Sequence, residues 1–267
     1  MGVLLKNMRN LDCELTLIDS AQVFHWQKFE EGFAAVVGGR IMTEKDTDAD
    51  ACVYFDDARD YSSLAKECGA FPIAVKAIES LPGLKVLNQP EWEALIAFIL
   101  SANNNVKRIR GLVMSLCEKY GDKYTFGGHT LYGFPEPKTL AALDPNVLKK
   151  QVTFGYRAEY IVETSKMICD GFELGEIKHM PVEAARKELM RLKGVGPKVA
   201  DCVLLFGCRH ADAFPVDVWV ARLMESWFNV TGSREHMCLE ARRLLGDNCG
   251  LIQQALFHAA RTGKIEL

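Results

Sequence analysis

The 267-residue sequence lacks long apolar runs, closely spaced cysteine pairs, internal repeats and low-complexity segments. Its longest apolar stretches, residues 94–100 and 199–207, are much shorter than the roughly 20 residues that cross a bilayer, so we expect no membrane-spanning helix. The N-terminus shows no apolar core of a secretion signal. Nine cysteines without a C-x-x-C pair do not favour a structural zinc site or a disulfide framework, so we expect reduced thiols and an intracellular protein.

The composition, 49% apolar and 25% charged, is typical of a soluble globular protein. The net charge of −3 argues against a nucleic-acid partner, but the charges are unevenly distributed. Residues 1–81 contain 8 Lys/Arg and 14 Asp/Glu, whereas basic residues outnumber acidic ones in 107–123 and 183–209. Because salt screens charges beyond about 10 Å, such local patches can bind phosphates on an acidic protein. Helical surfaces often carry basic runs, so the pattern favours DNA binding only weakly.

The hydrophobic periodicity changes near residue 85. Before it, short runs with aromatic content predict strands at 14–18, 23–29, 33–37, 40–43 and 51–55, with Gly38-Gly39 suited to a two-residue hairpin turn and helices at 61–68 and 72–80. After it, helical spacing predicts helices from Pro90 and at 106–120, 137–143, 145–150, 157–170, 182–192, 197–207, 218–227, 237–245 and 250–262. The sequence thus predicts an α+β protein, with a small antiparallel β-rich N-terminal domain, residues 1–85, and a larger all-α domain, residues 86–267.

Two of these predicted helices are joined by a tight turn that contains Gly194 and Gly196. Glycine lets the backbone turn sharply and approach another molecule closely. The turn's amides and the N-terminus of the second helix are suited to a phosphate. This is the helix-hairpin-helix pattern, a clamp for the DNA backbone, although an ordinary tight corner between helices would explain the glycines about as well.

Lys198 and Asp217 are the candidate catalytic residues. Lys198 is expected in the first turn of the second hairpin helix, where the helix dipole disfavours an added positive charge and so favours the neutral, nucleophilic amine. The alternative is a solvated surface lysine. Asp217 precedes an apolar helical run, which is typical of an N-cap. Its carboxylate could also stabilise positive charge that develops on a deoxyribose during bond cleavage.

The segment Gly-Val-Gly-Pro-Lys-Val-Ala-Asp-Cys, followed by Pro-Val-Asp-Val, resembles the 8-oxoguanine DNA glycosylase/AP lyase family of the helix-hairpin-helix glycosylase superfamily. The resemblance extends from about residue 20 to the C-terminus. It implies a bifunctional base-excision repair enzyme in which Lys198 forms a Schiff base and Asp217 is the catalytic aspartate. The positions that match phosphate-binding residues of the family are Gly194, Gly196, Val199 and Trp219.

The resemblance also implies residues that handle the base opposite the lesion. Asn103, the first of three consecutive asparagines, matches the residue that fills the space left by the extruded base. Tyr156 matches the wedge that opens the base stack. Arg108 and Arg157 match arginines that donate to the orphaned cytosine, and the resemblance therefore implies a preference for lesions opposite cytosine.

The damaged-base pocket implied by the resemblance contains Ala21, Cys202, Gln253 and Phe257. Gln253 would bind the Watson–Crick edge of the base, while Phe257 and Cys202 would enclose its two faces. The sequence departs from the family at two positions. Ala21 stands where the family's eukaryotic members carry a glycine, whose carbonyl accepts from the N7–H of oxidised guanine, and Trp219 stands where a histidine contacts phosphate.

The implied partner is double-stranded DNA with an oxidised guanine, bound by a monomer in the nucleoid or the nucleus. No cofactor is expected to be required. Four closely spaced cysteines for an iron–sulfur cluster are missing near the C-terminus, whereas a structural cation on hairpin carbonyls near Leu192 and Val195 is compatible with the motif. Two alternatives stay open: a monofunctional alkyl-base glycosylase on the same scaffold, which Lys198 disfavours, and a non-enzymatic DNA-binding module, which the combination of Lys198, Asp217, Gln253 and Phe257 disfavours.

Overall fold

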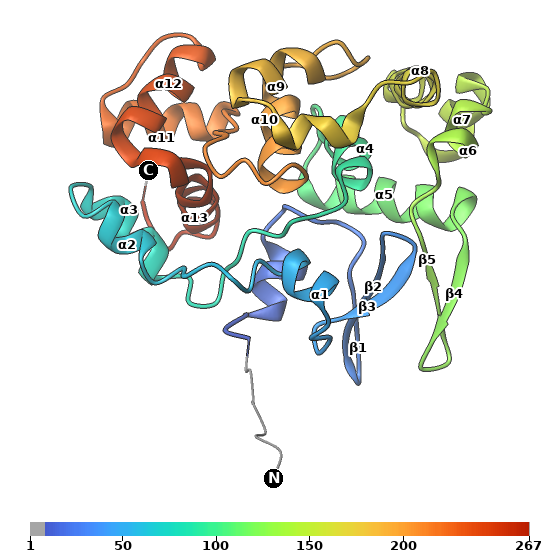
Figure 1. Cartoon of the computed structure of the whole chain (residues 1–267), viewed down its shortest axis with the longest axis horizontal. Coiled ribbons are helices and arrows are strands. Elements are labelled where there is room, and N and C mark those ends of the chain that lie inside the picture. The colour runs from blue at the N-terminus through green and yellow to red at the C-terminus, as the bar shows by residue number, and fades with distance from the viewer. Residues whose placement is uncertain (1–8, 267) are drawn as a thin grey trace.

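A computed structural model describes residues 9–266 of the chain (Figure 1). A three-stranded antiparallel sheet in the order β1-β2-β3 is built from β1 (Gln27–Phe29), β2 (Gly32–Val37) and β3 (Arg40–Thr43). Val37 pairs with Arg40 across the turn, where Gly38 and Gly39 have φ angles of +56° and +79°. These angles suit glycine and confirm the predicted two-residue hairpin.

A second antiparallel hairpin, which the sequence analysis did not predict, consists of β4 (Lys123–Phe126) and β5 (His129–Tyr132). It lies beside the first sheet (Figure 1). Leu131 is buried with Ala34 and Val36 of β2, and the Tyr124 hydroxyl donates to the Gly39 carbonyl oxygen at 2.9 Å. Residues on both sides of the expected boundary at 85/86 therefore share one small core.

Two predicted strands are helices. Residues 14–18 lie in a π-helix, η1 (Glu14–Asp19), and residues 51–55 lie largely in α1 (Ala49–Tyr54). The Asp48 side chain accepts from two amides of the first turn of α1, and this cap favours a helix over an extended strand. Of the predicted strand 23–29, only residues 27–29 belong to the sheet, as β1. Val23 to Trp26 are all buried, so they lack the alternation of buried and exposed side chains that is typical of a half-buried strand.

Helices form most of the remainder, and α5 coincides with its predicted range while the others end within a few residues of theirs. Their bounds are α2 (Leu64–Glu67), α3 (Pro72–Glu79), α4 (Glu91–Ser101), α5 (Val106–Tyr120), α6 (Pro137–Ala141), α7 (Pro145–Val152), α8 (Arg157–Cys169), α9 (Val182–Leu189), α10 (Pro197–Phe206), α11 (Val218–Phe228), α12 (Arg234–Leu245) and α13 (Cys249–Arg261), with 3-10 turns η2 (Leu174–His179) and η3 (Gly246–Asn248). The α+β prediction, a small antiparallel sheet region followed by a mainly helical part, is confirmed. None of the helices within 9–266 is long and apolar enough to cross a membrane.

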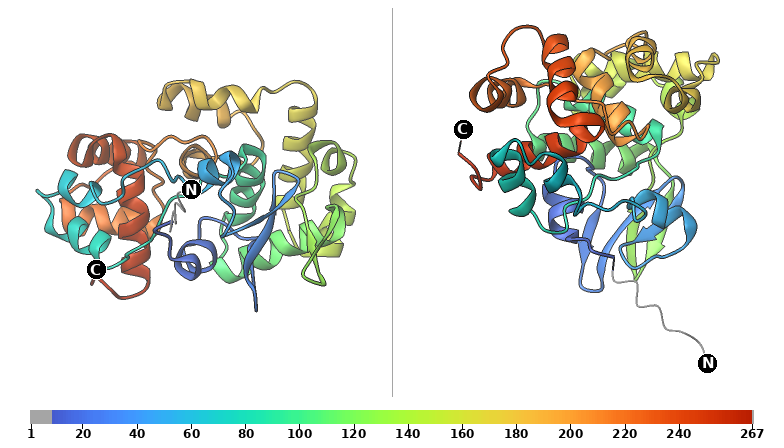
Figure 2. Two further views of the ribbon diagram at one scale, coloured as in Figure 1. Left: turned by 60° about the horizontal axis from the view of Figure 1, so that its bottom comes forward. Right: turned by 60° about the vertical axis from the view of Figure 1, so that its left-hand side comes forward.

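The helices form two hydrophobic cores. One surrounds α4, whose residues from Ala94 to Leu100 are all buried, and includes α5, α8 and α10. The other joins α11, α12 and α13. Helix α3, from the first 85 residues, packs against α13 and contributes to this second core (Figure 2). The division into domains at residues 1–85 and 86–267 stays a prediction.

Candidate active site

The hairpin between α9 and α10 has a turn that requires glycine at Gly194. Its φ is +79°, and a Cβ atom there would lie 2.6 Å from Cδ2 of the Tyr160 ring. Gly196 is the N-cap of α10, and a Cβ added to it would meet no atom within 4 Å, so the turn is open on that side. The Thr164 hydroxyl donates to the Lys193 carbonyl oxygen at 2.8 Å and holds the turn. Val199 is buried, so its contribution to a phosphate site would come from its backbone amide.

Lys198 lies half-buried in the first turn of α10. Its Nζ atom is 3.5 Å from Ser101 Oγ and 5.3 Å from the centroid of the Phe98 ring. Cys202, one turn further along α10, is buried beside it. Burial raises the pKa of the Cys202 thiol to about 11, while the charge of Lys198 and a hydrogen bond to it act in the opposite direction. Asp217 is the N-cap of α11. Its negative charge also raises the pKa of the Cys202 thiol.

Lys198 and Asp217 line one small cavity. The other residues of its wall are Ala21, Phe98, Cys202, Phe206, Pro215, Gln253, Gln254 and Phe257. The cavity volume is about 50 Å³, well below the roughly 300–1,000 Å³ of typical ligand pockets. A purine base could therefore enter only if a wall moved. Phe257 is only half-buried and is the aromatic wall residue with most access to solvent.

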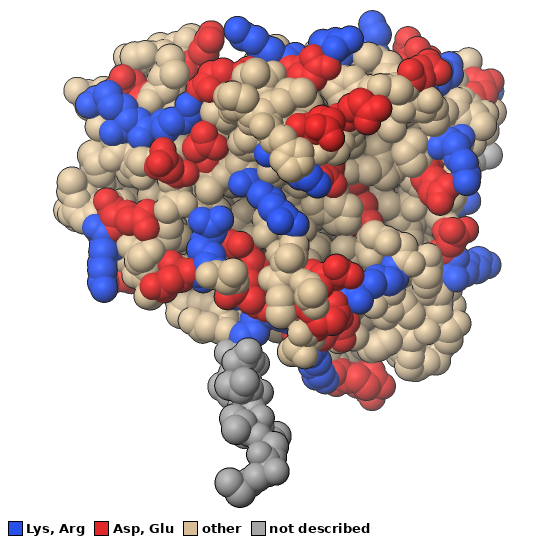
Figure 3. All heavy atoms as spheres, in the orientation of Figure 1, with Lys and Arg blue, Asp and Glu red and all other residues tan. Residues whose placement is uncertain are grey.

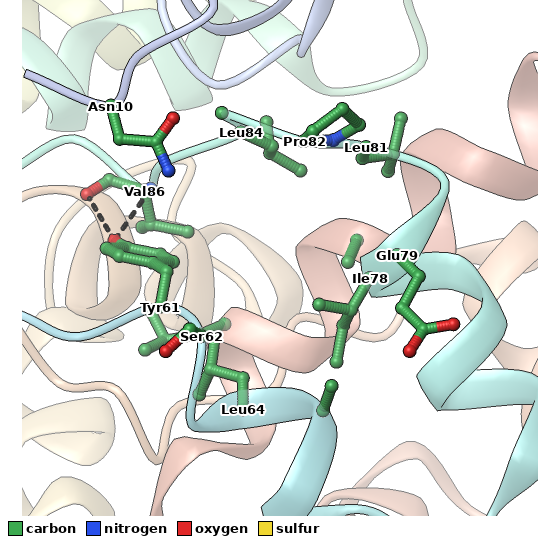
Figure 4. A pocket seen from close by; sticks show the side chains of 14 residues that line it. Asn10, Tyr61, Ser62, Leu64, Ile78, Glu79, Leu81, Pro82, Leu84 and Val86 are labelled. Carbon is green, nitrogen blue, oxygen red and sulfur yellow. Dashed lines mark hydrogen bonds between the residues drawn. The ribbon is translucent and has the colours of Figure 1, made fainter.

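Larger cavities lie elsewhere. One of about 320 Å³ is lined mainly by apolar residues, with the Tyr61 hydroxyl bonded to the backbone of Val86 at its edge (Figure 4). It contains none of the predicted site residues. Size alone therefore does not mark the functional site in this molecule.

Gln253 and Phe257, four residues apart on α13, both line the small cavity with Cys202. The Gln253 side chain is 5% exposed. Its Oε1 atom is buried without a hydrogen-bond partner among the described residues. An unsatisfied buried acceptor costs about 1–3 kcal/mol, which a ligand with an N–H group would recover.

Ala21, which the resemblance aligns with a glycine of the family's eukaryotic members, adopts a left-handed backbone conformation with φ of +60°. Such a conformation costs a non-glycine residue about 1–2 kcal/mol. The turn is held in place by its neighbours: Gln254 Nε2 donates to the Ser20 carbonyl oxygen at 2.7 Å, and Gln22 Nε2 donates to Ser20 Oγ at 3.0 Å. These two hydrogen bonds hold the turn with alanine at this position. The alanine methyl group lies in the cavity wall, on a residue whose backbone conformation is strained.

A second group of predicted residues meets at the turn after α4. Asn103, with φ of +52°, donates from Nδ2 to the Tyr156 hydroxyl at 3.1 Å. The Tyr156 ring is 44% exposed. Asn103 and Tyr156, 53 residues apart in the sequence, therefore form one exposed polar–aromatic pair, and their roles toward DNA stay predictions.

The two predicted cytosine-reading arginines differ in their surroundings. Arg157 is 6% exposed; its guanidinium stacks on Tyr156 and donates from Nε to the Ala102 carbonyl oxygen at 2.8 Å. Arg108 is exposed and makes a long hydrogen bond to the Thr153 carbonyl oxygen at 3.4 Å. Arg108 is therefore freer to reach a base, whereas Arg157 would first have to move its buried donors.

Residues 96–245, which include the hairpin and Asp217, match the model of the HhH-GPD superfamily base excision DNA repair protein. The chain belongs to this superfamily. It is 34% identical over 210 residues to the probable N-glycosylase/DNA lyase of Methanothermobacter thermautotrophicus, covering 71% of this chain and 67% of that protein. This relative places the chain among the N-glycosylase/DNA lyases of the superfamily.

Two further relatives agree. The N-glycosylase/DNA lyase of Saccharomyces cerevisiae is 35% identical over 167 residues, which cover 58% of this chain and 44% of the yeast protein, so the chain spans less than half of that relative. The Clostridium acetobutylicum 8-oxoguanine glycosylase/lyase, solved in complex with double-stranded DNA containing cytosine opposite 8-oxoguanine, has a TM-score of 0.87 and 30% identity, covering 96% of this chain and 94% of that one.

The glycosylase site contains two residues for which the sequence analysis predicted no role. Ser101, the last residue of α4, and Phe98, one turn earlier, both contact Lys198. Ser101 directly precedes the turn that contains Asn103, which could have drawn attention to it. Phe98 stands in a helix whose residues are nearly all apolar, and no local signal separates it from a core residue.

The basic clusters of the sequence do not stand out as one basic patch on the face that Figure 3 shows. Basic and acidic side chains are interspersed there. Within the basic cluster 183–209, Arg186 pairs with Asp201 and Arg191 with Glu188. Trp219 is 49% exposed with the Arg222 guanidinium 5.7 Å from its ring, so both could meet DNA.

Across residues 9–266, no group of three or more His, Cys, Asp or Glu side chains is arranged to hold a metal ion.

Proposed function

We propose that this N-glycosylase/DNA lyase excises 8-oxoguanine from double-stranded DNA, preferentially opposite cytosine. Lys198 is the nucleophile and Asp217 its electrostatic partner. One observation carries the proposal: both side chains line a single cavity whose wall also includes Gln253, a residue whose buried Oε1 atom has no hydrogen-bond partner in the described part of the chain. The similarity to the Clostridium acetobutylicum enzyme supports the choice of lesion.

In the proposed reaction, the hairpin amides hold phosphates while the damaged nucleotide leaves the stack and enters the cavity. Asn103 and Tyr156 occupy the space that it leaves. The base lies between Cys202 and Phe257, and a donor on its edge satisfies Gln253 Oε1. The present cavity is too small for this, so entry of the base requires Phe257 or a neighbouring wall residue to move.

The covalent step begins with neutral Lys198. Its lone pair forms a bond to C1′ as the bond between C1′ and the base breaks, and the electron pair of that bond leaves with the base, which takes up the proton that the lysine nitrogen then loses. Asp217 stabilises the positive charge that develops on the sugar. The nitrogen lone pair then opens the sugar ring to give the protonated Schiff base, and O4′ takes up a proton from water. Loss of a C2′ proton with cleavage of the C3′–O bond then nicks the strand on the 3′ side.

No redox cofactor enters these steps. A structural cation held by the carbonyl groups of Leu192 and Val195 stays a prediction, as does the monomeric state. Because its substrate is DNA, the enzyme is expected to act in the nucleoid or nucleus. A monofunctional alkyl-base glycosylase is disfavoured by Lys198, because that reaction needs no amine in the cavity.

Borohydride trapping tests the proposal. On duplex DNA with 8-oxoguanine opposite cytosine, the wild type should form a covalent complex, and Lys198→Gln should form none while binding the duplex with similar affinity. Lys193→Gln, which changes an exposed lysine of the same hairpin, is the matched control and should still be trapped. Trapping of Lys198→Gln would assign the nucleophile elsewhere. Release of 3-methyladenine without any release of 8-oxoguanine would refute the choice of lesion.

A further inference from the structure

We propose that Ser101 is a positioning residue that orients the amine of Lys198 for attack; the inference rests on the proposed role of Lys198 as nucleophile. Ser101 is the last residue of α4 and is 8% exposed. Its Oγ atom lies 2.7 Å from the Phe98 carbonyl oxygen and 3.5 Å from Lys198 Nζ. The serine thus joins the C-terminus of one helix to the first turn of another, 97 residues away in the sequence.

The direction of these hydrogen bonds follows from the chemistry of the hydroxyl group. A serine hydroxyl has one proton and two acceptor lone pairs. The Phe98 carbonyl oxygen can only accept, so the Ser101 proton points to it. The lone pairs of Oγ are then left for Lys198, which donates an N–H. Ser101 therefore acts as a fixed acceptor and neither gains nor loses a proton during the reaction.

The bond to Ser101 limits how the amine can turn. Cys202, one turn further along α10, is buried and lines the same cavity as Lys198. A neutral amine has two N–H bonds and one lone pair. When one N–H bond points to Ser101 Oγ, the lone pair and the other N–H bond are left for the cavity. Lys198 and Asp217 line this cavity, whereas Ser101 is not among the described residues of its wall. Ser101 therefore holds the amine from outside the space that the sugar would enter. Such fixed orientation lowers the entropic cost of reaching the reactive geometry.

Ser101 also belongs to the turn that is proposed to enter the duplex. The next residue, Ala102, accepts the hydrogen bond from Arg157, and Asn103 donates to Tyr156. A displacement of this turn by bound DNA would move Ser101 with it. Ser101 and Asn103 are two residues apart. The backbone between them therefore links the amine of Lys198 to the Asn103–Tyr156 pair, which is proposed to replace the extruded base.

The test measures binding and chemistry separately on the 8-oxoguanine:cytosine duplex. Ser101→Ala should lower the single-turnover rate constant at saturating enzyme about tenfold, a change of about 1.4 kcal/mol, which is the size of one hydrogen bond. The duplex Kd should change less than about twofold, since the buried Ser101 hydroxyl is bonded to Phe98 and Lys198 and is not exposed to a ligand. Ser101→Cys, with a weaker acceptor of similar shape, should also be slow, and Ser101→Thr, which restores the hydroxyl, should recover most of the rate.

Ser165→Ala is the matched control. Ser165 is fully buried in α8 and donates to the Ile161 carbonyl oxygen at 2.6 Å, so it has the same local bonding without Lys198 beside it. An unchanged rate in Ser101→Ala and Ser101→Cys, or an equal loss in Ser165→Ala, would overturn the role of Ser101 while leaving Lys198 as the nucleophile. If the wild type cannot be trapped at all, both proposals fail. Melting temperatures of the variants identify any loss of rate that comes from unfolding.

Discussion

Asp217 Oδ1 accepts a hydrogen bond from the Val220 backbone N–H at 2.8 Å, so the proposed catalytic carboxylate is also the N-cap of α11. We expect Asp217→Asn to fold with a nearly unchanged melting temperature, because the amide oxygen can still cap the helix. The single-turnover rate should fall about 10²–10³-fold, since an amide cannot balance the positive charge on the sugar. If the rate survived, Asp217 would be only a cap.

The left-handed conformation of Ala21 predicts that Ala21→Gly stabilises the protein. Relief of about 1–2 kcal/mol of strain is partly offset by the greater freedom of glycine in the unfolded chain, which leaves a gain of about 0.5–1 kcal/mol. The melting temperature should rise by about 1–4 °C. Ala70→Gly is the control, because Ala70 has no positive φ and this exposed turn residue should gain nothing. A lower melting temperature for Ala21→Gly would show that the turn is not strained.

Arg108 is exposed beside the Asn103–Tyr156 pair, and its role depends on whether it reads a base or a phosphate. A good base contact discriminates by about 1–3 kcal/mol. Lesion:cytosine duplexes should therefore be cleaved much faster than lesion:adenine duplexes, and Arg108→Ala should narrow this ratio while cleavage opposite cytosine is largely kept. A phosphate contact would instead weaken binding equally for every opposite base and reduce the dependence on salt. Single-turnover rates with all four opposite bases separate the two outcomes.

A buried pair, His25 and Glu93, predicts how stability depends on pH. Their Nε2 and Oε2 atoms are 3.6 Å apart, and neither has a hydrogen-bond partner among the described residues. Burial lowers the pKa of His25 from 6.5 to about 3, with a smaller effect of Arg110 in the same direction. Burial raises the pKa of Glu93 from 4.5 to about 8, against the hydrogen bond from the Gly38 amide.

The signs of these two shifts are opposite. The raised pKa of Glu93 stabilises the fold at low pH, and this contribution is lost as the pH rises from 4.5 through 8. The lowered pKa of His25 makes stability fall as the pH drops below 6.5 towards 3. Between 4.5 and 6.5 the two effects oppose each other, so this pair gives the highest free energy of unfolding there and a decline up to pH 8. Glu93→Gln should flatten the alkaline decline in melting temperature, whereas the exposed Glu225→Gln should not.

The two glycine hairpins show how far local sequence signals reach. Gly38-Gly39 predicted a hairpin because apolar strands flank it. Gly127-Gly128 adopts similar angles, but its strands are short and mostly exposed, and they are stabilised by burial of Leu131 against β2 rather than by their own pattern. Residues 14–18 show the opposite case, in which a local pattern was misleading. Their apolar and polar residues alternate as in a strand, but they form a π-helix, and the Asp12 carboxylate accepts a hydrogen bond from the Leu15 amide at its start.

The site divides in the same way. The positions of Lys198 and Asp217 at helix starts were predictable because a hairpin motif and an N-cap are local patterns. The contact between Ser101 and Lys198 was not, because it joins residues 97 apart and no local pattern pairs them. The positive φ of Ala21 was also hidden, because it depends on hydrogen bonds that Gln254 and Gln22 make to the neighbouring Ser20.

The bond from Gln254 to Ser20 has a consequence for the protein during its synthesis. The two residues are 234 positions apart, and a ribosome adding roughly 5–20 residues per second needs on the order of ten to fifty seconds to pass from one to the other. During that time Lys198 can already be present, but the turn of Ala21 lacks its anchor and Gln253 and Phe257 do not yet exist. The nascent chain therefore contains the proposed nucleophile before the proposed base pocket, and we expect it to excise no damaged base until α13 has been made.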